Sequence, residues 1–342
     1  MPVRNVLEKN RIEYIDVLKG FLICTVVIGH VLVFFFQENS TERLDFRVIY
    51  SFHMFLFIFI SGYLIGVSTC DITSVWIRKR FCRLMIPYFI WTMITLVFLG
   101  EVSIRQYFIY LVAPSFWFLI ILFLCDFTLL CLNLICPIEK RKKALILSII
   151  FSGLIMVVDL KTRSILDITE IIHMYAIYLP FYFLGVFSYH YQEKIANIFN
   201  KGIYILLPLY PVSMILYTYK NHSTFVNYIN RITPEMLPTG LLNTISVMYN
   251  HFIVAPLGCV FFSWFIYKVS MNELIKKTMG YIGQYTLIIY VAEAYFFFRY
   301  TGSLTVDIIL SILLGIIMPI IIAKTVRLLS SNLYYLLLGT KR

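Results

Sequence analysis

Residues 14–36 read YIDVLKGFLICTVVIGHVLVFFF, an apolar run in which Lys19 and His30 stand out. About 20 apolar residues are needed for a helix to cross the hydrocarbon core of a bilayer, so this run predicts a membrane-spanning helix. It is too long for the apolar part of a signal peptide and has no small-residue cleavage site, so we expect it to be retained. Ionisable groups at membrane depth are costly and mark functional sites by default.

The composition extends this prediction to the whole chain. Of the 342 residues, 60% are hydrophobic and 14% are charged, whereas soluble domains are about 25% charged. The net charge of +11 does not indicate nucleic-acid binding, because the basic residues fall in short clusters between apolar runs, as the positive-inside rule describes. The seven cysteines lack metal-ligand spacing, so we interpret them as reduced and expect no metal site.

Ten apolar runs predict an all-α fold, a polytopic transmembrane helix bundle that forms one integral-membrane domain over residues 1–342, without an extra soluble domain. The expected spans are 14–36, 46–68, 84–100, 116–136, 143–159, 171–189, 202–218, 244–268, 281–299 and 303–327. Ten spans place both termini on one side of the membrane. That side carries 21 of the 29 lysine and arginine residues, so we expect both termini in the cytoplasm.

Two connections differ from the expected spans. Residues 103–115 form a short apolar stretch that ends in Pro114, which we interpret as a re-entrant or interfacial segment. Residues 219–243 make the longest polar connection.

The expected topology places the polar residues of the spans at approximate depths. Lys19 lies near the inner face, and His30 lies about 16 Å further out, because a helix rises 1.5 Å per residue. The second span runs inward and returns His53 to the same depth, while the ninth carries Glu293 there and Trp117 opens the fourth. We expect these four residues to share one layer in the outer part of the membrane.

The pattern of these residues indicates group transfer. Lys19 and His30 are eleven residues apart, close to three helical turns, so both project from one helix face. An anionic donor held at the lysine would reach the histidine; the alternative is a snorkelling lysine and a histidine hydrogen-bonded between helices. His53 has the same structural alternative. A buried carboxylate would orient the imidazole of His30, and both Asp126 and Glu293 are available, with Glu293 favoured by depth.

A basic cluster spans residues 78–83 and precedes Pro87. Arg80 and Arg83 are three residues apart, so on a helix they face the same way, and guanidinium groups recognise phosphates bidentately. This spacing favours a phosphate clamp, with a simple topology anchor as the alternative. The second cluster, residues 140–143, has no such geometry and is interpreted as an anchor.

These stretches resemble the acyltransferase-3 family of integral membrane O-acyltransferases, and within it the fucose 4-O-acetylase-like branch. Lys19 and His30 match the family signature of a basic residue, ten intervening residues and a histidine, and Arg80 and Arg83 match its Arg-x-x-Arg motif. The resembling segments, in family order, are 11–20 with Gly29-His30, 52–64, 80–88, 116–119 and 283–290. In one departure, Glu293 stands near the place where family members often have a histidine after the last segment.

The resemblance implies a ten-helix core that takes an acyl group, usually acetyl, from cytoplasmic acyl-CoA and delivers it to a carbohydrate hydroxyl at or beyond the outer face. The predicted site has a catalytic, a donor-binding and an acceptor-binding group of residues. The catalytic residues are His30 (as acyl acceptor or general base), Glu293 and His53; those for acetyl-CoA are Lys19, Arg80 and Arg83; those for the acceptor are Trp117 and Tyr290.

We therefore expect an O-acyltransferase in the cytoplasmic (inner) membrane that uses acetyl-CoA and a carbohydrate or lipid-linked sugar, without a metal or nucleic acid. The first alternative is a transporter or exporter of polysaccharides or small molecules. Such proteins commonly show internal repeats and paired broken helices, which this sequence lacks. The second alternative is a non-catalytic membrane scaffold with hydrogen-bonded core histidines.

Overall fold

The computed structural model describes residues 2–68, 71–100, 103–112, 115–137, 141–162, 169–215, 217 and 248–339. These residues form helices and their connections and contain no β-strand, which confirms the predicted all-α class. The chain divides into two compact units. The first comprises Met1–Phe57 and Glu193–Ile321, and the second comprises Ile58–Gln192 and Ile322–Arg342.

Within the described residues, seven helices are long and apolar enough to cross a membrane, which supports a multi-pass membrane protein. They are Glu13–Glu42, Leu44–Val67, Ser74–Leu99, Trp117–Ile135, Ile171–Ser188, Asn250–Val269 and Leu304–Leu329. Three shorter apolar helices are Lys143–Met156, Gly202–Met214 and Thr286–Phe296. The count of ten spans and the cytoplasmic position of the termini therefore stay predictions. The polar connection 219–243 lies outside the described residues.

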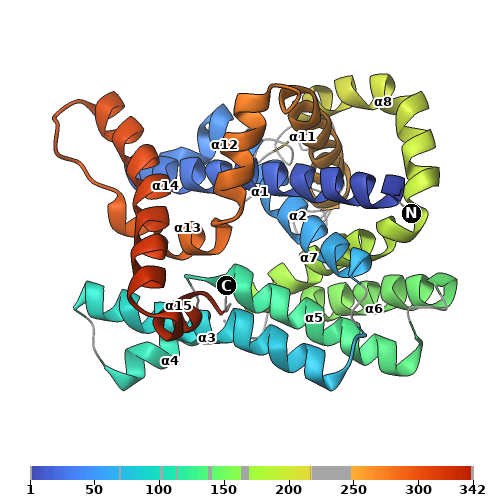
Figure 1. Cartoon of the computed structure of the whole chain (residues 1–342), viewed down its shortest axis with the longest axis horizontal. Helices are drawn as coiled ribbons and strands as arrows, with labels where there is room; N and C mark the ends of the chain where they lie inside the picture. Colours follow the sequence, from blue (N-terminus) through green and yellow to red (C-terminus); the bar gives the residue numbers. More distant parts are fainter. Residues whose placement is uncertain are drawn as a thin grey trace, which may run out of the picture. The chain divides into compact units, whose positions relative to one another are not determined.

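Helix α1 (Pro2–Phe36) is the centre of the first unit. It packs against α11 (Ala255–Val269), α12 (Glu273–Gly283) and α13 (Thr286–Ala292), and Figure 1 shows α12 crossing it. A β-carbon on Gly20 would lie 1.9 Å from the Met279 carbonyl oxygen, and one on Gly283 would lie 1.9 Å from the Asp16 carbonyl oxygen. The two backbones therefore touch where both helices lack a side chain.

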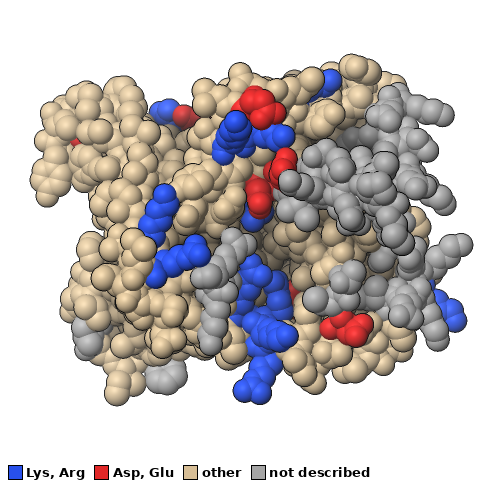
Figure 2. Space-filling view, in the orientation of Figure 1, with Lys and Arg blue, Asp and Glu red and all other residues tan. Residues whose placement is uncertain are grey.

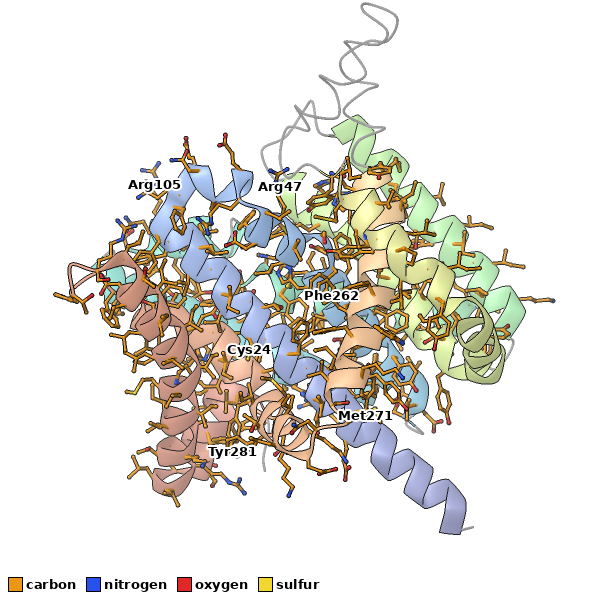
Figure 3. All side chains as sticks on the ribbon, turned by 90° about the horizontal axis from the view of Figure 1, so that it is seen from above. Cys24, Arg47, Arg105, Phe262, Met271 and Tyr281 are labelled. Carbon is orange, nitrogen blue, oxygen red and sulfur yellow. The ribbon has the colours of Figure 1, made fainter. Side chains whose placement is uncertain are left out.

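Stacked aromatic rings join α1 to α2 (Leu44–Val67) and α11. The ring of Phe262 lies 3.7 Å from that of Phe52 and 6.0 Å from that of Phe21, measured between centroids. Figure 3 shows α11, with Phe262 labelled, beside α1, with Cys24 labelled. Next to Phe52 in α2, the Ser51 hydroxyl lies 2.9 Å from the hydroxyl of Tyr210 on α8 (Gln192–Met214). A π-helical turn, η3 (Asn250–Val254), leads into α11.

The predicted ninth span, residues 281–299, is not a single helix. Helix α12 ends at Gly283, α13 covers seven residues, and the 3-10 turn η4 (Glu293–Phe296) follows. The backbone N–H groups of Gln284 and Tyr285 bond to carbonyls three residues earlier, which tightens the helix end and breaks its continuity. Beyond η4, the Ser311 hydroxyl bonds to the backbone of Phe298 and holds the chain against α14 (Leu304–Leu329).

The second unit contains α3 (Ser74–Leu99), α4 (Ile104–Val112), α5 (Trp117–Ile135), α6 (Arg141–Thr162), α7 (Thr169–Ser188) and α15 (Ser331–Leu338). Helix α5 packs on α3 and α7, and α15 packs on α3, as Figure 1 shows. The third predicted span, 84–100, is the later part of a longer helix that begins after the cap residue Thr73. The basic cluster therefore lies within α3.

Candidate active site

His30 and Glu293 meet directly in the first unit. The Nδ1 atom of His30, on α1, shares a short hydrogen bond with the Oε1 atom of Glu293, at the start of η4. With Glu293 ionised, its oxygen can only accept, so the Nδ1 atom of His30 carries the proton and the lone pair of a neutral imidazole lies on Nε2. Glu293 thus orients the histidine in the tautomer that a general base or a nucleophile needs.

The position of Glu293 depends on contacts that surround η4. A β-carbon on Gly315 of α14 would lie 3.2 Å from Val27 and 3.7 Å from the β-carbon of Glu293, so this glycine brings α14 close to both. Just beyond η4, an Arg299 Nη atom donates to the Phe34 carbonyl at 2.5 Å and to the Phe35 carbonyl at 3.1 Å. The guanidinium thereby satisfies carbonyls at the end of α1.

The two partners differ in accessibility. The side chain of His30 is 42% exposed, whereas that of Glu293 is 2% exposed. The second carboxylate oxygen of Glu293, Oε2, is buried and has no hydrogen-bond partner among the described residues. Few donors therefore compete with His30 for this negative charge, and the low dielectric strengthens their attraction. This pair can stabilise a positive charge that develops on an accessible imidazole.

His53 lies on α2 in a more enclosed setting. Its side chain is buried, and its Nδ1 atom donates to the Ile49 carbonyl at 2.6 Å. The ring of Tyr50 lies edge-on to the His53 ring at 4.9 Å, and it also lies 3.0 Å from the position of a β-carbon on Gly29. Tyr50 thus packs between His53 and the α1 backbone beside His30, and the two imidazoles lie within electrostatic range.

Lys19 lies toward the other end of α1 from His30. Its Nζ atom forms a salt bridge with Asp16 at 3.0 Å, and both side chains are partly exposed. Nearby, Lys276 of α12 bonds to Glu13 at 3.3 Å. Figure 2 shows charged side chains of both signs gathered over α12. On the face of α1 between Lys19 and His30, Ile23 and Val26 are buried.

Arg80 is held in a buried polar group of the second unit. Its Nε atom donates to Asp126 at 2.5 Å, and Tyr182 donates to the other oxygen of the same carboxylate at 2.5 Å. The side chains of Arg80 and Asp126 are 15% and 0% exposed. Asp126 therefore pairs with Arg80, and Glu293 is the carboxylate that pairs with His30. Of the two carboxylates that the sequence offered as partners of His30, Glu293 makes the contact and Asp126 does not.

The buried group of Arg80, Asp126 and Tyr182 links residues 52–64 and 80–88, two of the segments that resemble the family. A β-carbon on Gly62 would lie 2.1 Å from the Tyr182 carbonyl oxygen, and one on Gly185 would lie 2.1 Å from the Phe59 carbonyl oxygen. The backbones of α2 and α7 therefore approach closely at these two glycines. This approach fixes the position of α7 along α2. It therefore also fixes the position of the Tyr182 hydroxyl, which donates to Asp126.

The remaining predicted residues have varied settings. Arg83 is exposed on α3, and its charge acts on Asp126. Trp117 begins α5 and stacks on Tyr178 at 5.4 Å. It belongs to the second unit, so its place in a common layer with His30 stays a prediction. Tyr290 is partly buried on α13, one turn before Glu293.

Sequence reasoning did not identify Tyr182, Arg299 or Gly315 as supporting residues. Tyrosines number 25 in this chain, so type alone does not single out Tyr182. Arg299 carried a usable signal, because a cation next to a predicted span end often satisfies terminal carbonyls.

Among the described residues, no group of three or more His, Cys, Asp or Glu side chains could hold a metal ion. Disulfides are absent from the described cysteines, which are Cys24, Cys82, Cys125, Cys131, Cys136 and Cys259; Cys70 lies outside the described residues.

Comparisons with known proteins show the family of the chain. A family described as "Acyltransferase domain" matches residues 12–327. The nodulation protein NolL of Sinorhizobium fredii is 37% identical over 93 residues, a segment that covers 24% of each chain. The chain thus aligns with about a quarter of the length of this curated relative. No solved structure matches the chain.

Proposed function

The chain belongs to the acyltransferase-3 family, and from this premise we propose that it is a membrane O-acyltransferase that moves an acetyl group from acetyl-CoA to a carbohydrate hydroxyl. The observation that carries the proposal is the contact between the accessible imidazole of His30 and the buried carboxylate of Glu293. An oriented imidazole backed by a carboxylate is the arrangement that acyl transfer to a hydroxyl requires. The family match lends no support to the transporter alternative.

In the general-base form of the proposal, His30 Nε2 removes the proton of the acceptor hydroxyl as its oxygen attacks the thioester carbonyl. A carbon–oxygen bond forms, the carbon–sulfur bond breaks, and the proton passes from His30 to the departing thiolate. In the covalent form, Nε2 attacks the thioester carbonyl, the carbon–sulfur bond breaks and the thiolate departs, which leaves an acyl-imidazolium. The acceptor hydroxyl then attacks the acyl carbon, the carbon–nitrogen bond breaks, and the hydroxyl proton ends on the thiolate. Glu293 has the same task in both forms, because positive charge develops on the imidazole in each.

The donor is proposed to bind through cationic residues. Arg83 is exposed on α3, and a planar guanidinium suits a phosphate group. Arg80 lies beside it in the same motif, fixed by Asp126. Lys19 is a further candidate, although its salt bridge with Asp16 must rearrange before it binds a phosphate.

For the acceptor, we propose an exported or lipid-linked sugar of the fucose 4-O-acetylase-like type, reached at the outer part of a cytoplasmic membrane. His53, Tyr290 and Trp117 are the proposed residues near it. Aromatic and imidazole side chains suit a sugar because their faces pack on C–H groups and their polar atoms bond hydroxyls. Both termini are proposed to lie in the cytoplasm.

The test of the proposal uses purified protein in lipid nanodiscs, labelled acetyl-CoA and a glycolipid extract of the host cell. Wild-type protein is expected to transfer label to a sugar, and His30→Ala is expected to transfer none above background. The control variant Cys24→Ala shortens another partly buried side chain of α1 and should transfer normally. A His30→Ala protein that acetylates at the wild-type rate would exclude the proposed role. A labelled His30 after acid quench would select the covalent form.

A further inference from the structure

The short helix α15 follows α14 and lies beyond the family match, which ends at residue 327. Ser330 separates the two helices, and its hydroxyl accepts from the Leu333 N–H at 3.2 Å. This cap allows a new helix to begin at once in a different direction. Helix α15 buries Tyr334 and Leu338 and packs on α3, the helix that carries Arg80 and Arg83.

Two contacts attach α15 to α3. The Trp91 indole N–H donates to the Leu337 carbonyl at 3.0 Å. Gly339 ends α15 in the left-handed conformation, with φ of 64°. Its Cα lies so close to α3 that a β-carbon would be 2.4 Å from the Arg83 carbonyl oxygen and 2.5 Å from the Arg83 Cα.

The contact at Gly339 reaches the arginine motif itself. Asp126 and Tyr182 hold the same motif through Arg80. Arg83 is the exposed member, and its long side chain has many rotamers. A backbone fixed by a direct contact narrows the positions from which that side chain can reach a ligand.

We propose that α15 is a positioning element for the donor site, and that its packing at Gly339 holds Arg83 where it binds the phosphate groups of the acyl donor. The inference rests on the proposed function, because it assumes that the arginine motif binds a phosphorylated donor. It predicts that loosening α15 weakens donor binding and leaves the chemistry at His30 intact.

The test compares Gly339→Ala with Gly100→Ala. Both glycines end a helix of the second unit in the left-handed conformation, with φ of 64° and 73°, so alanine introduces the same backbone strain at each. Gly100 has nothing within 4 Å of an added β-carbon. The difference between the two variants therefore reports the contact with Arg83.

Coenzyme A binding and the steady-state constants for acetyl-CoA are measured in nanodiscs. Gly339→Ala is expected to raise Kd and KM about tenfold, the loss expected when one charge-assisted contact is weakened, with kcat changed less than about twofold. Gly100→Ala should match wild type in all three. Equal Kd values for the two variants would overturn the inference.

Two further variants keep the test decisive. Should Gly339→Ala fail to fold, Trp91→Phe removes the bond to Leu337 and should also raise Kd for coenzyme A; an unchanged Kd would then overturn the inference. Arg83→Ala separates the inference from its premise. An unchanged Kd in Arg83→Ala would refute the proposed donor site, whereas a raised Kd in Arg83→Ala together with a normal Kd in Gly339→Ala would refute the role of α15 alone.

Discussion

Replacing Glu293 by glutamine tests whether its charge, rather than its shape, serves His30. Glutamine is close to glutamate in size and can still accept the His30 Nδ1 proton, so the geometry of the contact at η4 is preserved. What is lost is the negative charge beside the imidazole. The ground state, with a neutral imidazole, is affected less than the transition state, in which positive charge develops on the ring.

The expected magnitude follows from the burial of the pair. A hydrogen bond between neutral groups contributes about 0.5–1.5 kcal/mol, and one to a charged group about 1.5–3 kcal/mol. Glu293 is 2% exposed and its Oε2 has no partner among the described residues, so solvent screens its charge little. We therefore expect a loss of about 1–2.5 kcal/mol of transition-state stabilisation, the difference between the two kinds of hydrogen bond, which lowers kcat about 5- to 70-fold.

The assay is the initial rate of thiol release from acetyl-CoA in the presence of the glycolipid extract. The matched control is Glu273→Gln, because Glu273 lies on α12 in the same unit with its side chain 70% exposed. An exposed carboxylate contributes little, so this control should keep its kcat within about twofold of wild type.

A double variant makes the test specific to the pair. If Glu293 acts through His30, adding Glu293→Gln to His30→Ala should cause no further loss of rate. The reasoning is refuted by a folded Glu293→Gln protein with wild-type kcat. It is refuted equally by a Glu293→Gln effect of the same size with and without His30.

Two predictions concern stability, both measured as thermal unfolding in detergent. Gly283→Ala should destabilise the protein by about 1–3 kcal/mol, because its methyl group would lie 1.9 Å from the Asp16 carbonyl oxygen. In the control Gly153→Ala, the methyl group has nothing within 4 Å, so this variant should be neutral or stabilising. Equal melting temperatures for the two variants would contradict the contact. Asp126→Ala should cost about 3–5 kcal/mol because it leaves Arg80 buried without its partner, and Tyr182→Phe about 1 kcal/mol. A larger loss in Tyr182→Phe would show that the ion pair is not the main contribution.

The sequence was sufficient to predict the helical class and the common level of His30 and Glu293. Long apolar runs report membrane helices directly, and the count of residues along the first and ninth expected spans, which both run outward, placed His30 and Glu293 at one level. It could not show that these residues face each other. That depends on the rotation of α13 and η4 about their axes, which Gly315 and Arg299 fix through contacts between distant segments.

The break after Gly283 was hidden for a related reason. Residues 281–299 are apolar and aromatic almost throughout, so hydropathy alone reads them as one span. The tight bonds at Gln284 and Tyr285 form only where α12 meets α1. The partner of Arg80 was similarly hidden, because Asp126 is 46 residues away, and local spacing does not report such a pair.

The His30–Glu293 contact joins residues that are 263 positions apart. A ribosome adds about 5–20 residues per second, so α1 is made roughly 13–53 s before the glutamate that completes the pair. During that interval a nascent chain has its histidine without the carboxylate that orients it. The contact therefore cannot form until synthesis has almost reached the last long helix, α14.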